Sequence, residues 1–227
     1  MTPAAPSPYA VVFDFDGVLA DTERLHLRAY QHVFGKRGWT LGEREYFDQY
    51  LGYDDAYLFE TFAANRGLAL DAATRGDLFR EKVDAFAALV ANGQALFPGA
   101  ADCVRALADR FALAIASGSL HEEIVRVIEP AALAPYFPVI VGADDVARSK
   151  PAPDPYLEAV KRLGVPSSAA VAVEDSRWGL FAARTAGLRC IGITTSYPAS
   201  ELPDAEIVIN AIGQLTPALV EALLSRA

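Results

Sequence analysis

Short apolar runs alternate with amphipathic stretches along most of the chain. The runs are rich in β-branched, aromatic and alanine residues, which predicts buried strands of a parallel sheet. The stretches between them place apolar residues three and four positions apart, as on one face of a helix. The predicted strands are 9–13, 111–116, 138–142, 169–173, 190–193 and 206–209. The predicted helices of this part of the chain are 101–109, 121–128, 155–163, 178–186 and 217–225.

This alternation predicts an α/β fold, with a Rossmann-like parallel sheet that helices cover on both faces. It is suspended after the first strand, where four helical patterns follow one another at 23–36, 43–50, 56–66 and 72–91. We therefore expect an inserted α-helical, four-helix cap domain over 23–94, placed to act as a lid. The catalytic core would comprise 9–22 and 95–227, after a disordered tail at 1–8.

The amino-acid composition argues against some classes of function. The net charge is −9 and no basic cluster occurs, which argues against nucleic-acid binding through phosphate contacts. No run of 18 or more apolar residues occurs, so we expect no membrane span. Cys103 and Cys190 lie apart in apolar segments without metal-type spacing, which predicts reduced core thiols and a cytoplasmic protein.

Two acidic residues, Asp14 and Asp16, directly follow the first predicted strand. The carboxyl ends of parallel strands form the ligand crevice of such sheets. Burying two carboxylates there is unfavourable without a cation or hydrogen-bond donors. Gly17 lets the backbone turn, so that one carboxylate could attack a substrate while the other transfers a proton. A chemical role is therefore expected for this pair.

Ser117, Gly118 and Ser119 follow the second predicted strand of the core. A hydroxyl, a flexible glycine and free amides at a helix start could bind an anion. Ser119 and Glu122 are expected to form a capping box that opens the next helix. The alternative is an ordinary strand-to-helix turn with no ligand.

Lys150 lies just before two closely spaced prolines, which would hold it on a rigid, extended segment. Its ammonium could bind phosphate and offset the carboxylates, or it could be a surface lysine. Glu174, Asp175 and Ser176 follow another predicted strand. One of these residues could simply cap the next helix, but adjacent carboxylates at a sheet edge suit Mg²⁺. Together these groups predict a phosphoryl-transfer site.

The chain resembles the haloacid dehalogenase superfamily over nearly its whole length. Four segments carry the resemblance in the family's order: DFDGVLADT (14–22), IASGS (115–119), SKPAPDPY (149–156) and VAVEDS (171–176). The helical insert resembles the small cap of the subgroup that includes phosphoglycolate phosphatases, sugar-phosphate phosphatases and beta-phosphoglucomutases.

This resemblance implies roles for individual residues. Asp14 would be the nucleophile that becomes an aspartyl-phosphate, and Asp16 the acid/base. Ser117 and Lys150 would bind phosphate, next to Gly118, and Lys150 would also neutralise Asp14. Asp175 would bind Mg²⁺ beside Asp14 and the backbone carbonyl of Asp16, with Glu174 assisting. The implied activity is Mg²⁺-dependent hydrolysis of a small phosphorylated metabolite, such as a sugar or polyol phosphate.

The main alternative is a phosphomutase of the beta-phosphoglucomutase type. Thr22 and His26 match a pair at its cap hinge, and Lys82 matches a cap lysine that would bind substrate. His26 could also be an ordinary helix residue. A mutase needs a second cationic phosphate site, whereas residues 51–55 read LGYDD, so we predict hydrolysis. Leu51, Tyr53, Tyr57 and Lys82 are the candidates for specificity, and we expect a monomer or a weak homodimer.

Overall fold

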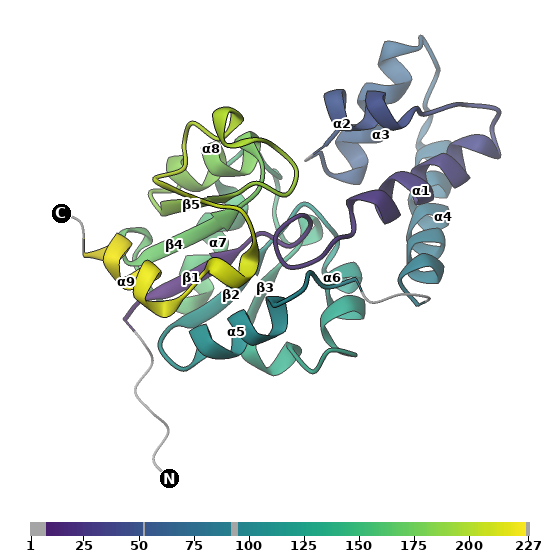
Figure 1. Cartoon of the computed structure of the whole chain (residues 1–227). Coiled ribbons are helices and arrows are strands. Elements are labelled where there is room, and N and C mark those ends of the chain that lie inside the picture. Colours follow the sequence, from purple (N-terminus) through teal and green to yellow (C-terminus); the bar gives the residue numbers. More distant parts are fainter. Residues whose placement is uncertain (1–7, 52, 92–94, 226–227) are drawn as a thin grey trace.

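A computed structural model describes residues 8–51, 53–91 and 95–225 of the chain (Figure 1). The predicted tail lies outside these residues except for Pro8, as do Gly52 of the LGYDD segment and the predicted end of the insert near Gly93. None of the described helices is long and apolar enough to cross a lipid bilayer.

The core is a six-stranded parallel sheet in the order β3-β2-β1-β4-β5-β6. This order confirms the Rossmann-like prediction and places a crevice outside the carboxyl ends of the central strands. At the centre, Val12 of β1 lies opposite Ala114 of β2 and Ala172 of β4. The strands are β1 (Ala10–Phe13), β2 (Ala112–Ala116), β3 (Val139–Val141), β4 (Ala170–Glu174), β5 (Arg189–Ile193) and β6 (Ile207–Ile209).

Helices cover both faces of the sheet, which explains why its strands are apolar throughout. Val11 and Phe13 pack on the face covered by α5 (Ala100–Ala108), α6 (His121–Ile128) and α9 (Pro217–Leu224). Ala10 and Val12 pack on the other face, against α7 (Asp154–Leu163) and α8 (Arg177–Thr185). Cys103 and Cys190 are free and buried, as predicted. Short 3-10 helices lie at Ala134–Tyr136, Ala143–Asp145, Ser167–Ala169, Ala199–Glu201 and Ile212–Gln214.

The insert between β1 and α5 is helical, as predicted. It consists of α1 (Glu23–Gly35), α2 (Glu43–Gln49), α3 (Asp55–Asn65) and α4 (Ala72–Val90). These helices share an apolar cluster rich in aromatic side chains, in which the rings of Phe34 and Phe62 stack 4.1 Å apart. Figure 1 shows them grouped beyond the end of the sheet at which β1 finishes. They therefore lie where polar groups at the strand ends can face them.

One local prediction is wrong, namely the Ser119–Glu122 capping box. Helix α6 begins at His121 with Leu120 as its N-cap residue, one position later than that box requires. The Glu123 carboxylate accepts a hydrogen bond from Leu120 N instead, at 3.3 Å. Ser119 is thereby released from capping, and its hydroxyl points to another partner at the sheet edge.

Candidate active site

The chain turns sharply after β1, and the turn brings its two acidic residues to the sheet edge. Asp14 N donates to Val173 O at 2.9 Å, which continues the pairing of β1 with β4. Gly17 has a φ of 78°, a left-handed conformation that glycine adopts without strain. A Cβ atom at Gly17 would overlap the carboxylate of Asp175, which follows β4. The glycine thus allows the ends of β1 and β4 to meet.

Asp16 is enclosed by hydrogen-bond donors. Its Oδ1 accepts from Thr22 Oγ1 and lies 3.2 Å from His26 Nε2. Its Oδ2 accepts from Ser119 Oγ at 2.6 Å and from Ser117 Oγ at 3.4 Å. Burial would raise the pKa of the Asp16 carboxyl, but the charge and hydrogen bond of His26, with the serine and threonine donors, hold it below its usual range. These donors therefore stabilise the ionised form of Asp16 in this arrangement.

Lys150 links the acidic residues of β1 and β4. Its Nζ donates to Asp14 Oδ1 at 2.8 Å and to Glu174 Oε1 at 2.6 Å. The Tyr156 hydroxyl also donates to Glu174 Oε1, at 3.0 Å. Burial would lower the pKa of the Lys150 ammonium, but the two carboxylate charges raise it above its usual value. Lys150 is therefore a fixed positive charge beside Asp14.

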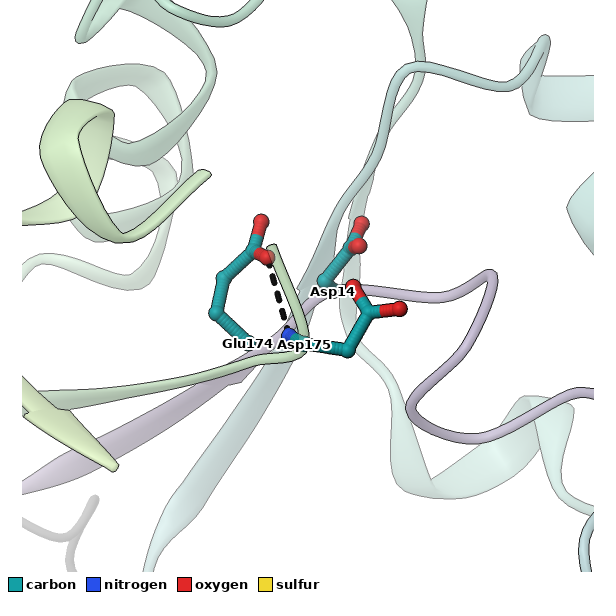
Figure 2. A group of neighbouring side chains, drawn as sticks. All are labelled: Asp14, Glu174 and Asp175. Atoms are coloured by element: carbon teal, nitrogen blue, oxygen red, sulfur yellow. Dashed lines mark hydrogen bonds between the residues drawn. The ribbon is translucent and has the colours of Figure 1, made fainter. Parts of the chain in front are cut away.

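Three buried carboxylates, from Asp14, Glu174 and Asp175, lie side by side at the ends of β1 and β4 (Figure 2). One oxygen of each lies within 4.8 Å of the others. Burial and the charge of Glu174 raise the pKa of Asp14 and of Asp175 well above the usual range. A divalent cation would relieve this crowding, and oxygen ligands of this kind suit Mg²⁺. These three residues could therefore hold a Mg²⁺ ion.

Glu174 is wedged against the first turn of α8. Its Oε2 accepts hydrogen bonds from Asp175 N, Ser176 N and Ser176 Oγ, each at 3.0 Å. Ser176 Oγ in turn accepts from Gly179 N and caps the helix. A Cβ atom at Gly179 would overlap the Glu174 carboxylate. The expected capping role thus falls to Ser176, while Asp175 faces the carboxylate cluster.

The segment that directly follows β2 forms another side of the site. Ser117 is fully buried, and its N donates to Val141 O at 3.0 Å, which fixes the backbone. Ser119 N donates to Ser117 Oγ at 3.0 Å. A Cβ atom at Gly118 would meet only Ser149 Oγ, at 3.9 Å, so this stretch leaves room beside the carboxylates.

One pocket brings these groups together with residues of the helical insert. The core contributes the carboxylates of Asp14, Asp16 and Asp175, the lysine and the serines, and helices α1 to α3 with the segment before α3 contribute an opposing wall. Glu174, Thr22, Tyr57 and Lys82 do not line the pocket. The lining residues are Asp14, Asp16, Glu23, His26, Tyr30, Tyr46, Leu51, Tyr53, Asp55, Ser117, Gly118, Ser119, Lys150, Asp175 and Ser176.

The order of these site residues along the chain is matched in known proteins. A family model for haloacid dehalogenase-like hydrolases matches residues 11–193, which include every core residue of the pocket. This chain belongs to that family. In this haloacid dehalogenase-like hydrolase, the candidate site lies at the carboxyl ends of β1, β2 and β4, and α1 to α4 are inserted after the first of these strands.

Several relatives of this hydrolase are similar over most of their length. Protein CbbY of Cereibacter sphaeroides is 37% identical over 217 residues, which are 91% of this chain and 93% of that protein. A crystal structure of a CbbY mutant from Rhodobacter sphaeroides in complex with xylulose-(1,5)bisphosphate has a TM-score of 0.83 and 32% identity, over 91% of this chain and 96% of that one. Phosphoglycolate phosphatase of Escherichia coli strain K12 is 33% identical over 147 residues, 63% of this chain and 58% of that protein.

Lys82 of this hydrolase lies away from the pocket, in the interior of the protein. Its side chain is fully buried, and Nζ contacts Glu123 Oε1 at 2.8 Å and Asp55 Oδ1 at 2.9 Å. A role in binding substrate stays a prediction. The observed contacts instead join α4 to α3 and to α6 of the core.

Three residues that line the pocket were not predicted from the sequence, namely Glu23, Tyr30 and Tyr46. The Tyr46 hydroxyl donates to Glu23 Oε2 at 2.8 Å, and burial together with the charge of Asp16 raises the pKa of Glu23 to about 7. Glu23 could have been found, because it lies three residues before His26 and so shares its helix face. The two tyrosines carry no comparable signal, since their positions depend on packing within the insert.

Proposed function

We propose that this protein is a Mg²⁺-dependent phosphatase that hydrolyses a small phosphorylated metabolite through an aspartyl-phosphate on Asp14. The observation that carries the proposal is the placement of Asp14 beside Lys150, within the carboxylate cluster and in the same pocket as Asp16. An attacking carboxylate, a proton carrier, a fixed cation and a metal-type cluster are the parts that phosphoryl transfer needs. The name of the phosphatase relative supports the same chemistry.

In the first step, an oxygen of Asp14 attacks phosphorus and the bond from phosphorus to the leaving oxygen breaks. The leaving alkoxide takes a proton from Asp16, so Asp16 must be protonated when this step begins. The contact between His26 Nε2 and Asp16 Oδ1 places an imidazole where it can exchange that proton. In the second step, Asp16 accepts a proton from water, the water oxygen bonds to phosphorus, and the bond to Asp14 breaks.

The negative charge on the transferring group has to be balanced. Mg²⁺ would be held by Asp14, Asp175 and Glu174 with the backbone carbonyl of Asp16, and when bound it would offset charge on the phosphoryl oxygens. Lys150 and the Ser117–Ser119 segment would bind the same oxygens from the other side. The two free, buried cysteines support a cytoplasmic location for the enzyme.

A phosphomutase of the beta-phosphoglucomutase type would use the same nucleophile and acid/base. Such an enzyme has to hold a bisphosphate, and therefore needs cations at two places. Lys150 is the only lysine or arginine among the described residues that line the pocket. This shortage of cations favours hydrolysis over the mutase.

The test is a phosphate-release screen of the purified protein over a panel of small phosphate esters. We expect release with Mg²⁺, loss of release on adding EDTA, and recovery with excess Mg²⁺. Asp14→Asn should abolish turnover while the melting profile stays cooperative, whereas Asp109→Asn, at an exposed position after α5, should keep it. Turnover by Asp14→Asn would remove the nucleophile, and isomerisation of β-glucose 1-phosphate that depends on glucose 1,6-bisphosphate would favour the mutase.

A further inference from the structure

Asp55 is a buried acidic residue on the insert side of the pocket. It is the first residue of α3, is 8% exposed and lines the pocket. Its Oδ1 accepts from Tyr30 OH at 2.5 Å and from Lys82 Nζ at 2.9 Å. Its Oδ2 is buried and has no hydrogen-bond partner among the described residues. A buried carboxylate oxygen without a donor is unfavourable, so this atom is suited to a donor that a ligand brings.

The hydrogen-bond donors on this wall are largely used within the protein. Tyr30 donates its hydroxyl proton to Asp55, and Tyr46 donates its own to Glu23. Asp55 is therefore left as an unpaired acceptor that faces the pocket. An unpaired acceptor selects a ligand group that carries a donor, and a hydroxyl group is the simplest of these.

Among the described residues, this side of the pocket has no lysine or arginine for a second anionic group. Lys82, the nearest buried lysine, is already paired with Asp55 and Glu123 and does not line the pocket. Its contacts fix Asp55 Oδ1, so that Oδ2 is the atom left without a partner. A phosphate or carboxylate at the far end of a substrate would meet the Asp55 carboxylate here and be repelled.

Building on the proposed phosphatase activity, we propose that Asp55 determines specificity by accepting a hydrogen bond from a hydroxyl group of the leaving alcohol. The substrate class is then the phosphate monoester of an uncharged sugar or polyol. Esters whose leaving group carries a second phosphate or a carboxylate are excluded. Asp55 acts on substrate choice, while Asp14 and Asp16 carry out the chemistry for every ester.

Two matched pairs of substrates test the proposal. Sorbitol 6-phosphate and 6-phosphogluconate differ in having a hydroxymethyl group or a carboxylate at the far end. Glycerol 3-phosphate and 3-phosphoglycerate differ in the same way on a shorter chain. For each pair, kcat/KM is measured with Mg²⁺ for the unaltered protein, for Asp55→Asn and for Asp54→Asn.

We expect the unaltered protein to have an at least tenfold higher kcat/KM for the neutral ester than for the acidic one, in whichever pair has a leaving group long enough to reach Asp55. Asp55→Asn keeps an acceptor for Tyr30 and Lys82 but lacks the negative charge, and we expect this preference to fall at least tenfold. Asp54→Asn is the matched control, because Asp54 caps α3 by accepting from Tyr57 N and does not line the pocket. Its preference should stay within twofold of the unaltered protein.

Three results would overturn the proposal. The first is a higher kcat/KM for the acidic ester in both pairs. The second is an equal change in the ratio of kcat/KM values in Asp55→Asn and Asp54→Asn. Either result leaves the phosphatase activity itself intact, because phosphate release is still measured. The third is the absence of phosphate release from all four esters and from phenyl phosphate, which would overturn the proposed function as well.

Discussion

The Lys82 side chain offers a sharp test of how the insert is held to the core. It is fully buried, and its two carboxylate partners, Asp55 and Glu123, are 8% and 1% exposed. Burial would lower the pKa of the Lys82 ammonium, but Asp55 and Glu123 raise it above its usual value, so the lysine stays charged. Replacing it by methionine keeps most of the side-chain volume and removes the ammonium that contacts both members of this pair.

The expected loss of stability arises because two buried carboxylates lose their positively charged partner. Removing one partner of a buried ion pair destabilises a protein by about 3–5 kcal/mol, because the remaining carboxylates have no compensating cation. For a chain of 227 residues, each kcal/mol lowers the melting temperature by about 2–4 °C. Lys82→Met should therefore melt about 6–20 °C below the unaltered protein.

Calorimetric melting at pH 7.5 measures this effect against a matched control. Lys36→Met removes a half-exposed lysine whose Nζ lies 3.2 Å from Glu81, and should cost less than about 1 kcal/mol. Adding Asp55→Asn and Glu123→Gln to Lys82→Met removes the stranded charges and should restore at least half of the loss. If Lys82→Met and Lys36→Met melt at the same temperature, the buried network does not stabilise the fold.

Two further predictions concern the site. Gly179→Ala should cut phosphate release at least tenfold, because the new Cβ overlaps the Glu174 carboxylate. The control is Gly76→Ala within α4, whose Cβ would meet only Arg80; it should keep phosphate release and gain about 0.5–1 kcal/mol of stability. Equal activity of the two variants would show that the close approach of Gly179 to Glu174 does not matter for phosphate release. The folded-state pKa of Glu23 is about 7 against an ordinary 4.5, so the folded protein holds this proton longer and stability falls as pH rises from 4.5 to 7. Glu23→Gln should weaken that decline in melting temperature, and parallel profiles would refute it.

Most of the core could be predicted from sequence because its signals are local. Strands buried on both faces are apolar throughout, and parallel strands bring their carboxyl ends to one edge. Asp14 and Ser117 directly follow such a run, and Asp175 comes one residue after another, so their meeting in one pocket could be expected from the sequence. The same logic gives the helical insert, since an unbroken series of helical patterns cannot continue a sheet.

The wall opposite these carboxylates could not be predicted in the same way. Tyr30 and Asp55 are 25 residues apart, and Lys82 and Glu123 are 41 apart, so their contacts depend on tertiary packing. The error at Ser119 has a similar origin. Its local sequence pattern favoured helix capping, but in the fold its hydroxyl donates a hydrogen bond to Asp16. A hydrogen bond to a buried carboxylate is stronger than one at a helix end, and Glu123 accepts from the N-cap residue Leu120 instead.

Glu123 connects the two halves of the site. Its Oε2 accepts from Leu120 N, at the end of the segment that carries Ser117 and Ser119, and its Oε1 accepts from Lys82. Because Lys82 also holds Asp55, one buried chain of contacts runs from the proposed phosphate-binding segment to the proposed specificity residue. A shift of α4 away from α6 would break this chain at Lys82 and leave Tyr30 as the donor that still holds Asp55 Oδ1. The contacts of Lys82 therefore couple the position of the insert to the phosphate-binding side of the proposed site.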